Sequence, residues 1–202
     1  MKNKIKTIAI AVLTILSVGI SELKAQDKTT ISVETDPLTY LFNGYSVHVR
    51  VKPKGTDRIL VGTGMLLGPL FTTAKLPEFF VNLNSENKNK EWSVETTGSY
   101  SLFGEYFFQK VNGGWFVGGQ IGIQKYRIKR TSFTDQHSDY DQLVLMTYGG
   151  YTFHLFNSSF YIKPWAGIGY TPKINGSNTL NGTEYKILSI TPFVTFHIGY
   201  TF

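Results

Sequence analysis

The stretch Leu188-Ser-Ile-Thr-Pro-Phe-Val-Thr-Phe-His-Ile-Gly-Tyr-Thr-Phe202 decides the fold of this chain. Its even-numbered positions are apolar or aromatic, whereas most of its odd-numbered positions are small or polar. Successive side chains of a β-strand point to opposite faces of the sheet. The segment therefore predicts a strand with one bulky apolar face and one mostly polar face.

The same alternation recurs at 45–52, 92–106 and 115–124. A dry core around the polar face of the first segment would bury Arg50 and Lys52 without partners, at a cost of several kcal/mol each. A polar lumen accepts both cations, as in a transmembrane β-barrel whose bulky apolar residues face lipid. We expect the lumen network to contain His48, Arg50, Lys52, Glu95, Glu105, Gln120, Gln124, Lys163 and His197.

Turn-forming residues divide the chain into eight expected strands, near 30–41, 44–53, 58–68, 91–108, 114–131, 141–156, 159–172 and 185–202. Short connections at 53–57, 109–113 and 157–158 alternate with long ones at 69–90, 132–140 and 173–184. Short periplasmic turns and long outer loops produce this alternation. The prediction is an all-β, eight-stranded, antiparallel, up-and-down transmembrane β-barrel whose last strand pairs with its first.

The first hairpin fits this scheme least well. Proline cannot donate to a sheet ladder, and Pro37 falls inside the first expected strand. Residues 37–43 could form a helical turn at the barrel wall instead. A second helix start is expected in the long loop, where Pro77 is followed by Glu78. That helix could pack on the barrel rim or act as a lid or adhesive element.

The first residues have the pattern of an export signal. Residues 1–6 are basic, 7–20 are apolar, and Ala25 ends a small-residue cleavage site. We expect a signal peptide over 1–25 and a mature barrel over 26–202, the alternative being an uncleaved anchor or a buried helix. The apolar stretch is too short to cross a bilayer as a helix.

Composition and charge exclude several classes of function. The chain has 15% aromatic residues, 20 glycines, 17% charged residues and no cysteine. The absence of cysteine excludes disulfides, thiolate metal sites and the lipid-modified cysteine of a lipoprotein. Half of the net charge of +6 lies in the first 25 residues, and no basic run follows. Nucleic acid is therefore not an expected partner.

The strands at 91–108 and 114–131 are longer than the ~9–11 residues that cross a membrane. The short turn at 109–113 is expected to face the periplasm. The extra residues of both strands should therefore extend beyond the membrane on the outer side of the cell. The outward positions of the second strand change there from isoleucines to Lys125, Arg127 and Lys129. We expect these cations to meet lipopolysaccharide phosphates, the alternative being an ordinary solvated strand end.

The ending Thr195-Phe-His-Ile-Gly-Tyr-Thr-Phe202 resembles the C-terminal assembly signal of outer-membrane barrels. The segments Gly113-Gly-Trp-Phe-Val-Gly-Gly-Gln120 and Tyr161-Ile-Lys-Pro-Trp-Ala-Gly-Ile-Gly-Tyr170 resemble the aromatic–glycine strands of small OmpA/OmpX-like barrels. This resemblance implies a monomeric protein of the bacterial outer membrane that contacts its lipids, its lipopolysaccharide and its assembly machinery. The residues that would carry the signal are Phe196, Ile198, Tyr200 and Phe202.

No motif indicates an enzyme, a metal site or a cofactor. The lumen histidines His48, His154 and His197 lie on different strands and lack metal-ligand spacing. The tripeptide His137-Ser-Asp139 contains the residue types of a hydrolase triad, but neighbouring side chains diverge too far to act together. Glu95 and Glu105 would lie roughly 33 Å apart on one strand, at ~3.3 Å per residue, too far for a glycosidase pair.

The expected function is that of an outer-membrane barrel with a polar, mostly plugged lumen, because eight strands leave an interior just wide enough for side chains. A structural or adhesive role is favoured, and a narrow channel is a second form of the same class. Two other classes stay open. One is an outer-membrane lipid-modifying enzyme, and the other is a soluble, lipocalin-like periplasmic ligand binder.

Overall fold

A computed structural model describes residues 28–66, 74–156 and 158–202. The expected signal peptide at 1–25 lies outside the described residues, as does part of the long loop at 69–90. Among the described residues, no helix is both long enough and apolar enough to span a membrane.

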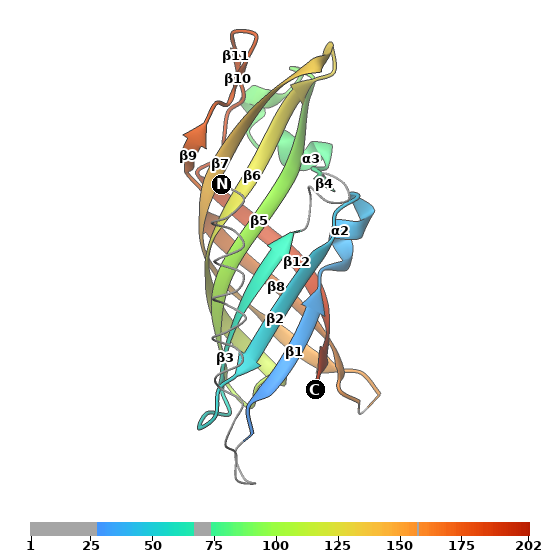
Figure 1. Ribbon diagram of the computed structural model, residues 1–202, viewed down its shortest axis with the longest axis vertical. Helices are drawn as coiled ribbons and strands as arrows, with labels where there is room; N and C mark the ends of the chain where they lie inside the picture. The colour runs from blue at the N-terminus through green and yellow to red at the C-terminus, as the bar shows by residue number, and fades with distance from the viewer. Residues whose placement is uncertain (1–27, 67–73, 157) are drawn as a thin grey trace, which may run out of the picture.

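Eight antiparallel strands close into a ring (Figure 1). Each strand of the ring pairs with the strand on either side of it. β3 pairs with β5, which is the next strand of the ring along the chain. The all-β, up-and-down barrel topology is therefore confirmed. The strands of the ring are β1 Thr30–Thr35, β2 Ser46–Lys52, β3 Ile59–Leu66, β5 Trp92–Phe107, β6 Gly114–Arg130, β7 Phe133–His154, β8 Phe160–Tyr170 and β12 Ile190–Thr201.

The ring is closed by its first and last strands, as predicted. β1 pairs with β12 from Ser32 opposite Thr201 to Thr35 opposite Ile198. Closure leaves no edge strand at this seam, which is what a barrel needs when its surroundings cannot supply hydrogen bonds. The upper part of β12, residues 190–197, extends beyond the end of β1, where no strand of the described chain pairs with it on that side.

A short helix replaces the upper half of the expected first strand. Helix α2, Pro37–Leu41, begins at Asp36, whose carboxylate accepts a hydrogen bond from the Leu38 amide at 2.9 Å. Proline at the first helical position and an aspartate cap both favour a helix start. Thr195 on β12 donates to the other Asp36 oxygen at 2.8 Å, so the helix is tied to the wall at this point.

The connections between strands differ in length at the two ends of the barrel. Residues 53–58, 108–113 and 155–159 connect strands at the lower end, which also holds the C-terminus (Figure 1). At the upper end, α3 Glu78–Val81 follows Pro77, where a helix start was expected. The other small elements of the upper connections are β4 Ala74–Lys75, the 3₁₀ turn Ser85–Asn87, β9 Lys173–Gly176, β10 Thr179–Leu180 and β11 Thr183–Glu184.

The prediction of a long loop at 132–140 is wrong. β7 begins at Phe133 and pairs with β6 almost to its end, so only residues 131–132 connect the two strands. The physical reason is visible in the pairing: Asp139 lies opposite Arg127, and Tyr140 lies opposite Tyr126. Opposite charges and aromatic pairs across two strands stabilise a ladder. A run of polar residues therefore belongs to a strand here, and not to a loop.

A β-bulge in β5 reverses the faces of the strand near its upper end. The pairing with β6 shifts between Thr96 and Gly98, which leaves Thr97 without an opposite residue. An extra residue exchanges the two faces of a strand beyond it. Below the bulge Ser101 and Glu105 are buried in the interior, whereas Leu102 is exposed on the outside. Above it Trp92 and Val94 are buried in the interior, although the alternation predicted that they face outward.

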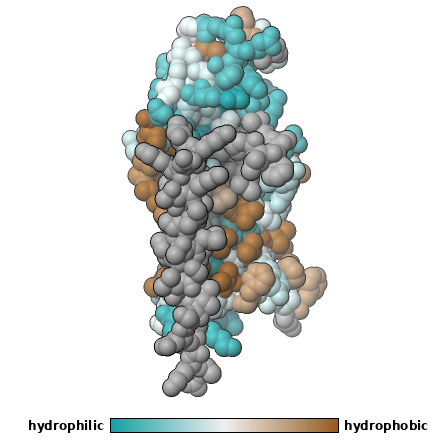
Figure 2. Space-filling model, viewed as in Figure 1, coloured by the Kyte–Doolittle hydropathy of each residue, from teal (hydrophilic) through white to brown (hydrophobic). Residues whose placement is uncertain are grey.

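The outer surface of the lower barrel is apolar on every strand. The exposed side chains include Val33, Val47, Val61, Leu102, Ile121, Leu145, Ile168 and Val194, one from each strand of the ring. Hydrophobic residues gather across the middle of the face shown in Figure 2, below a hydrophilic top. Aromatic rings border this belt. Below it lie Tyr106, Phe108, Trp115, Tyr151, Phe153, Phe160, Tyr200 and Phe202.

The lower mouth of the barrel is closed by a turn that folds inward. Asn112, in the left-handed region at φ 59°, is buried and lies between the first and last strands. Its side-chain amide donates to Ser32 Oγ and to Thr201 Oγ1, each at 2.9 Å. Phe107 and Phe116 stack directly behind the turn, with their ring centroids 5.3 Å apart. Polar and aromatic groups thus fill the interior at this end.

Candidate functional site

A cluster of four charged side chains crosses the centre of the barrel. Arg50 from β2 lies 2.5 Å from Glu34 of β1 and 2.5 Å from Glu105 of β5. Lys163 from β8 forms ion pairs with the same two carboxylates. All four side chains are at most 2% exposed. Three residues expected in the lumen network, Arg50, Glu105 and Lys163, are thus joined by ion pairs.

Hydrogen bonds from the neighbouring strands complete the cluster. The hydroxyl of Tyr148 donates to Glu105 at 2.9 Å, and that of Tyr161 donates to Glu34 at 2.7 Å. The indole of Trp165 lies 3.3 Å from His197 Nε2, and the other ring nitrogen of His197 lies 2.8 Å from Glu34. Because an indole N–H can only donate, this arrangement assigns a neutral His197 with its proton on Nδ1.

The charges of this cluster balance. Two carboxylates face one guanidinium and one ammonium, and a neutral His197 adds nothing to the sum. A balanced, hydrogen-bonded set can persist without water, whereas one uncompensated charge could not. Lys163 also lies 4.5 Å from the centre of the Phe116 ring, so an aromatic face covers its remaining side. With its hydrogen-bonded tyrosines and His197, the cluster is a polar plug that joins six strands of the wall, namely β1, β2, β5, β7, β8 and β12.

The sequence did not identify Glu34, Tyr148 and Tyr161 as members of this network. Glu34 follows Thr30 and Ser32 on the inward face of β1, so the alternation contained the signal. The proline at position 37 interrupts this alternation, because it cannot join a sheet ladder. The two tyrosines were hidden by a different effect. Aromatic side chains of such strands are expected to face lipid. Only the positions of Tyr148 and Tyr161 in the alternation of β7 and β8 show that both point inward.

Above the plug the barrel encloses a cavity of about 330 Å³. Its lower boundary includes Arg50, Tyr148 and His197, and its upper boundary includes Tyr126, Tyr140 and Tyr185. Of the predicted lumen residues, Gln120, Gln124 and His48 line this space. Small side chains leave this space open. One row of residues paired across β2, β3, β5 and β6 consists of His48, Gly64, Ser101 and Gly122.

The structure places two predicted lumen residues elsewhere. Lys52 lies at the lower rim, where it pairs with the exposed Asp57 at 3.3 Å. Glu95 does not face the lumen, and that prediction is wrong. The bulge after Thr96 turns Glu95 to the outer surface, where Lys129 holds it at 2.9 Å. No property of the alternating pattern indicated an extra residue at this position.

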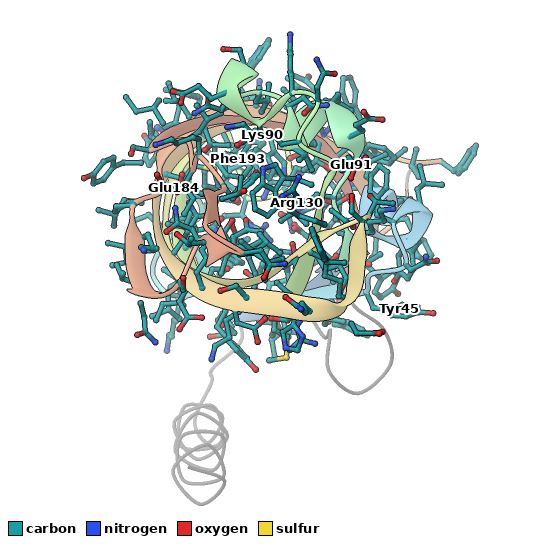
Figure 3. All side chains as sticks on the ribbon, turned by 90° about the horizontal axis from the view of Figure 1, so that it is seen from above. Tyr45, Lys90, Glu91, Arg130, Glu184 and Phe193 are labelled. Carbon is teal, nitrogen blue, oxygen red and sulfur yellow. The ribbon has the colours of Figure 1, made fainter. Side chains whose placement is uncertain are left out.

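An apolar cap closes the barrel above the cavity. It consists of Val81, Trp92, Val94, Ile128, Tyr140, Leu180 and Tyr185, all buried. Arg130 extends over the cap, 5.8 Å from the Trp92 ring, and lies within the ring of strands in the view from above, whereas Tyr45 lies outside it (Figure 3). The interior thus changes from polar at the plug to apolar at the cap, opposite to the change on the outer surface.

The three cations expected to face lipopolysaccharide lie on the outer surface of the upper barrel. Arg127 and Asp139 are joined by two hydrogen bonds of 2.8 and 2.9 Å, and Lys129 pairs with Glu95. The hydrogen bond from Arg127 lowers the pKa of Asp139. Lys125 is exposed and lies opposite Asp141 in the ladder. Two of the three cations therefore already have a carboxylate partner within the chain.

The suspected hydrolase residues do not form a site. Ser138 donates to the Ser177 carbonyl at 2.9 Å, and Asp139 is held by Arg127. His154, which belongs to the expected lumen histidines and not to this tripeptide, is exposed at the lower end, 3.3 Å from the Ser158 carbonyl. Within residues 28–66, 74–156 and 158–202, no group of three or more histidine, aspartate and glutamate side chains could hold a metal ion.

The four residues of the suspected assembly signal alternate along the outer face of β12. Ile198 and Phe202 are exposed, and Tyr200 stands against Phe160 and Phe202 at 4.7 and 4.9 Å between ring centroids. Phe196 is half-buried on the same face. The backbone amide of Phe202 donates to the Ile31 carbonyl at 2.9 Å, which extends the closing seam to the last residue of the sequence.

No family model, no curated protein and no solved structure matches the chain.

Proposed function

We propose that the protein is an integral outer-membrane β-barrel with a closed polar lumen and a structural or adhesive role at the cell surface. The apolar belt carries this proposal. Every strand of the ring exposes bulky apolar side chains to the outside, and the charged side chains of the plug point inward. Soluble monomers rarely expose contiguous apolar patches of more than a few hundred Å². Lipid is the solvent that suits such a surface.

The two ends of the barrel favour one orientation. In outer-membrane barrels the short turns and both chain termini face the periplasm, and the longer segments face outward. Here the lower end holds the short turns and the C-terminus, whereas the β5, β6 and β7 strands extend beyond the belt at the upper end (Figure 1). The upper extension has charged pairs outside and an apolar cap inside, as expected for a part that stands in water.

Three barriers lie along the axis of the barrel and support a closed lumen. They are the Asn112 turn at the lower mouth, the charge cluster in the middle and the apolar cap at the top. An ion that entered would have to separate charges that are buried together, at a cost of several kcal/mol for each charge left alone. A plugged barrel therefore fits this interior better than a general porin.

The location is tested by single-cysteine labelling, because the natural chain has no cysteine. One variant, Ser132→Cys, places the cysteine in the turn between β6 and β7 at the upper end. The other, Thr56→Cys, places it in the turn between β2 and β3 at the lower end. A membrane-impermeant maleimide added to whole cells should label Cys at 132 and not at 56, and it should label both after lysis. Recovery in the soluble fraction, or the opposite labelling pattern, would overturn the proposal.

Conductance tests the closed lumen separately. The purified protein in a planar bilayer should show no steps of the size that a general porin gives. Glu105→Gln, which leaves Arg50 and Lys163 short of one carboxylate, should make openings more frequent. Steady, large conductance in the unaltered protein would exclude the plug while leaving the membrane location intact.

A further inference from the structure

The cavity above the plug contains hydrogen-bonding groups that the described chain leaves unused. The amide of Gln120 and the hydroxyl of Ser99, both half-buried, line it, and no hydrogen bond joins either side chain to another described residue. His48 stacks on His197 with 4.5 Å between ring centroids, and its Nδ1 is buried without a hydrogen-bond partner among those residues. Buried polar groups are normally satisfied, so an unsatisfied set around a cavity points to a ligand or to bound water.

The charge balance of the plug restricts what such a ligand can be. The plug next to this polar region is already neutral, since Glu34 and Glu105 compensate Arg50 and Lys163. An anionic or cationic group placed there would have no free counter-charge and would have to be desolvated at a large cost. A neutral group that both donates and accepts, such as a hydroxyl, an ester or an amide, matches Gln120 and Ser99.

The remaining walls are apolar, and the space extends sideways. Val144, Met146 and Phe193 form the inner wall, and Leu76, Phe80 and Leu188 form the outer part. The lining also includes Met65 and Val194, whose side chains are exposed on the outer surface. The cavity therefore reaches the outside beside α2, where β12 continues above the end of β1.

The position of this opening suggests the source of the ligand. In α2, Leu41 is 73% exposed, and Tyr40 packs edge-to-face on Tyr45 with ring centroids 5.3 Å apart. Exposed apolar residues beside such a pair are typical of the boundary between lipid and water. If the proposed membrane location is right, the opening faces the outer leaflet at that boundary, where amphiphiles concentrate.

We propose that this cavity binds one neutral, single-chain amphiphile from the membrane. Its uncharged polar head would hydrogen-bond to Gln120 and Ser99, and its chain would lie along Phe193 and Leu188 toward the opening beside α2. The volume of about 330 Å³ is at the small end of the range for ligand pockets, roughly 300–1,000 Å³. A medium-chain monoglyceride or fatty alcohol has the required size and chemistry.

Tryptophan quenching in lipid nanodiscs tests this proposal. Trp165 lines the cavity, whereas Trp115 lies on the lipid-facing surface and is 64% exposed. Two proteins that retain only one of these tryptophans are titrated with 11-bromoundecanol, a quencher with a neutral head. We expect saturable quenching of Trp165 and non-saturating quenching of Trp115. Monodecanoylglycerol should displace the quencher from Trp165, whereas decanoate and decyltrimethylammonium should not.

Two variants test the site itself. Gln120→Leu removes the head-group partner at similar volume and should weaken binding by roughly tenfold. Ser101→Phe should fill the cavity and abolish saturable quenching. Ile121→Leu, on the opposite face of the same strand, is the matched control and should bind like the parent. Heat-modifiable migration in gels verifies that each variant is folded.

Three outcomes would overturn the proposal. These are quenching of Trp165 that never saturates, unchanged binding by Gln120→Leu, or equal competition by the charged amphiphiles. Failure of the membrane location is recognised independently by the cysteine labelling above. In that case the same titration with the soluble protein would still decide whether the cavity binds a neutral amphiphile.

Discussion

Lys129 Nζ lies 2.9 Å from Glu95 Oε1 on the outer surface of the barrel, and this ion pair marks the height at which β5 has exchanged its two faces. Directly behind it, Trp92 and Val94 are packed in the apolar cap. If Thr97 were paired in the regular alternation and did not bulge, Glu95 would point into the cap and the indole of Trp92 would point to the outside. One unpaired residue, Thr97, thus allows Leu102 to lie on the outer surface below the bulge and Val94 to lie in the interior above it.

We predict that deletion of Thr97 is tolerated. Thr96 faces inward and Gly98 faces outward, so joining them directly restores a regular ladder and keeps every other side chain on its present face. Folding yield into detergent, measured by heat-modifiable migration, should stay near that of the parent.

Deletion of Leu102 is the matched control. It removes one residue from the regular part of β5, so Tyr100 must turn inward and Ser99 and Ser101 must turn to the lipid-facing side. Folding yield should fall severely. Equal behaviour of the two deletions would contradict the role assigned to the bulge.

Glu105→Ala should destabilise the barrel by about 3–5 kcal/mol, because it leaves Arg50 and Lys163 with one carboxylate between them in a buried site. Urea unfolding in lipid vesicles, followed by tryptophan fluorescence, would measure the change in the free energy of unfolding. Glu95→Ala is the control, since it breaks an ion pair at the surface. Such pairs contribute only about 0.2–1 kcal/mol, and a similar loss in both variants would argue against a buried plug.

The cap should loosen in alkaline solution. Burial raises the pKa of Tyr185 to about 12, from about 10 in an unfolded chain. Its contribution to stability is therefore fully present below about pH 10 and is lost as the pH rises through about 12. Hydrogen exchange of the cap amides should accelerate over this window. Tyr185→Phe keeps the edge contact with Trp92 at 5.6 Å and should shift the acceleration to higher pH; an unchanged profile would show that Tyr185 does not control the cap.

Removal of Phe202 should reduce the amount of folded protein in the outer membrane more than it reduces stability. Its ring is 75% exposed, so little buried area is lost, and its resemblance to an assembly signal is the reason for expecting a defect in the cell. Quantitative blotting of outer membranes, compared with urea unfolding of protein refolded in vitro, separates the two effects. Ile198→Ala, higher on the same face of β12, serves for comparison. Normal membrane levels without Phe202 would refute the interpretation.

Alternation alone predicted the ring, its closure and the direction of most side chains, because each face of a barrel strand meets one environment. Arg50, Glu105, Lys163 and His197 were placed in the interior for that reason, and the structure brings them together. Pro37 correctly indicated the helical turn, since proline cannot join a ladder.

The parts that the sequence did not predict depend on residues distant along the chain. The bulge at Thr97 is set by what surrounds the upper strand, namely Val81, Leu180 and Tyr185 from two other connections. The strand at 133–140 looked like a loop because its polar residues find their partners across the hairpin, as Asp139 does with Arg127. The cavity could not be foreseen, since it depends on small residues falling in one register row.

The inward turn at Asn112 has a consequence for the order in which the molecule assembles. Asn112 comes from the middle of the chain, yet its amide joins Ser32 on the first strand to Thr201 on the last. Both hydroxyls come within reach of it only after β1 and β12 have met. These two hydrogen bonds must therefore be among the last to form, and once made they hold the seam at the one place where the ring of strands begins and ends in sequence.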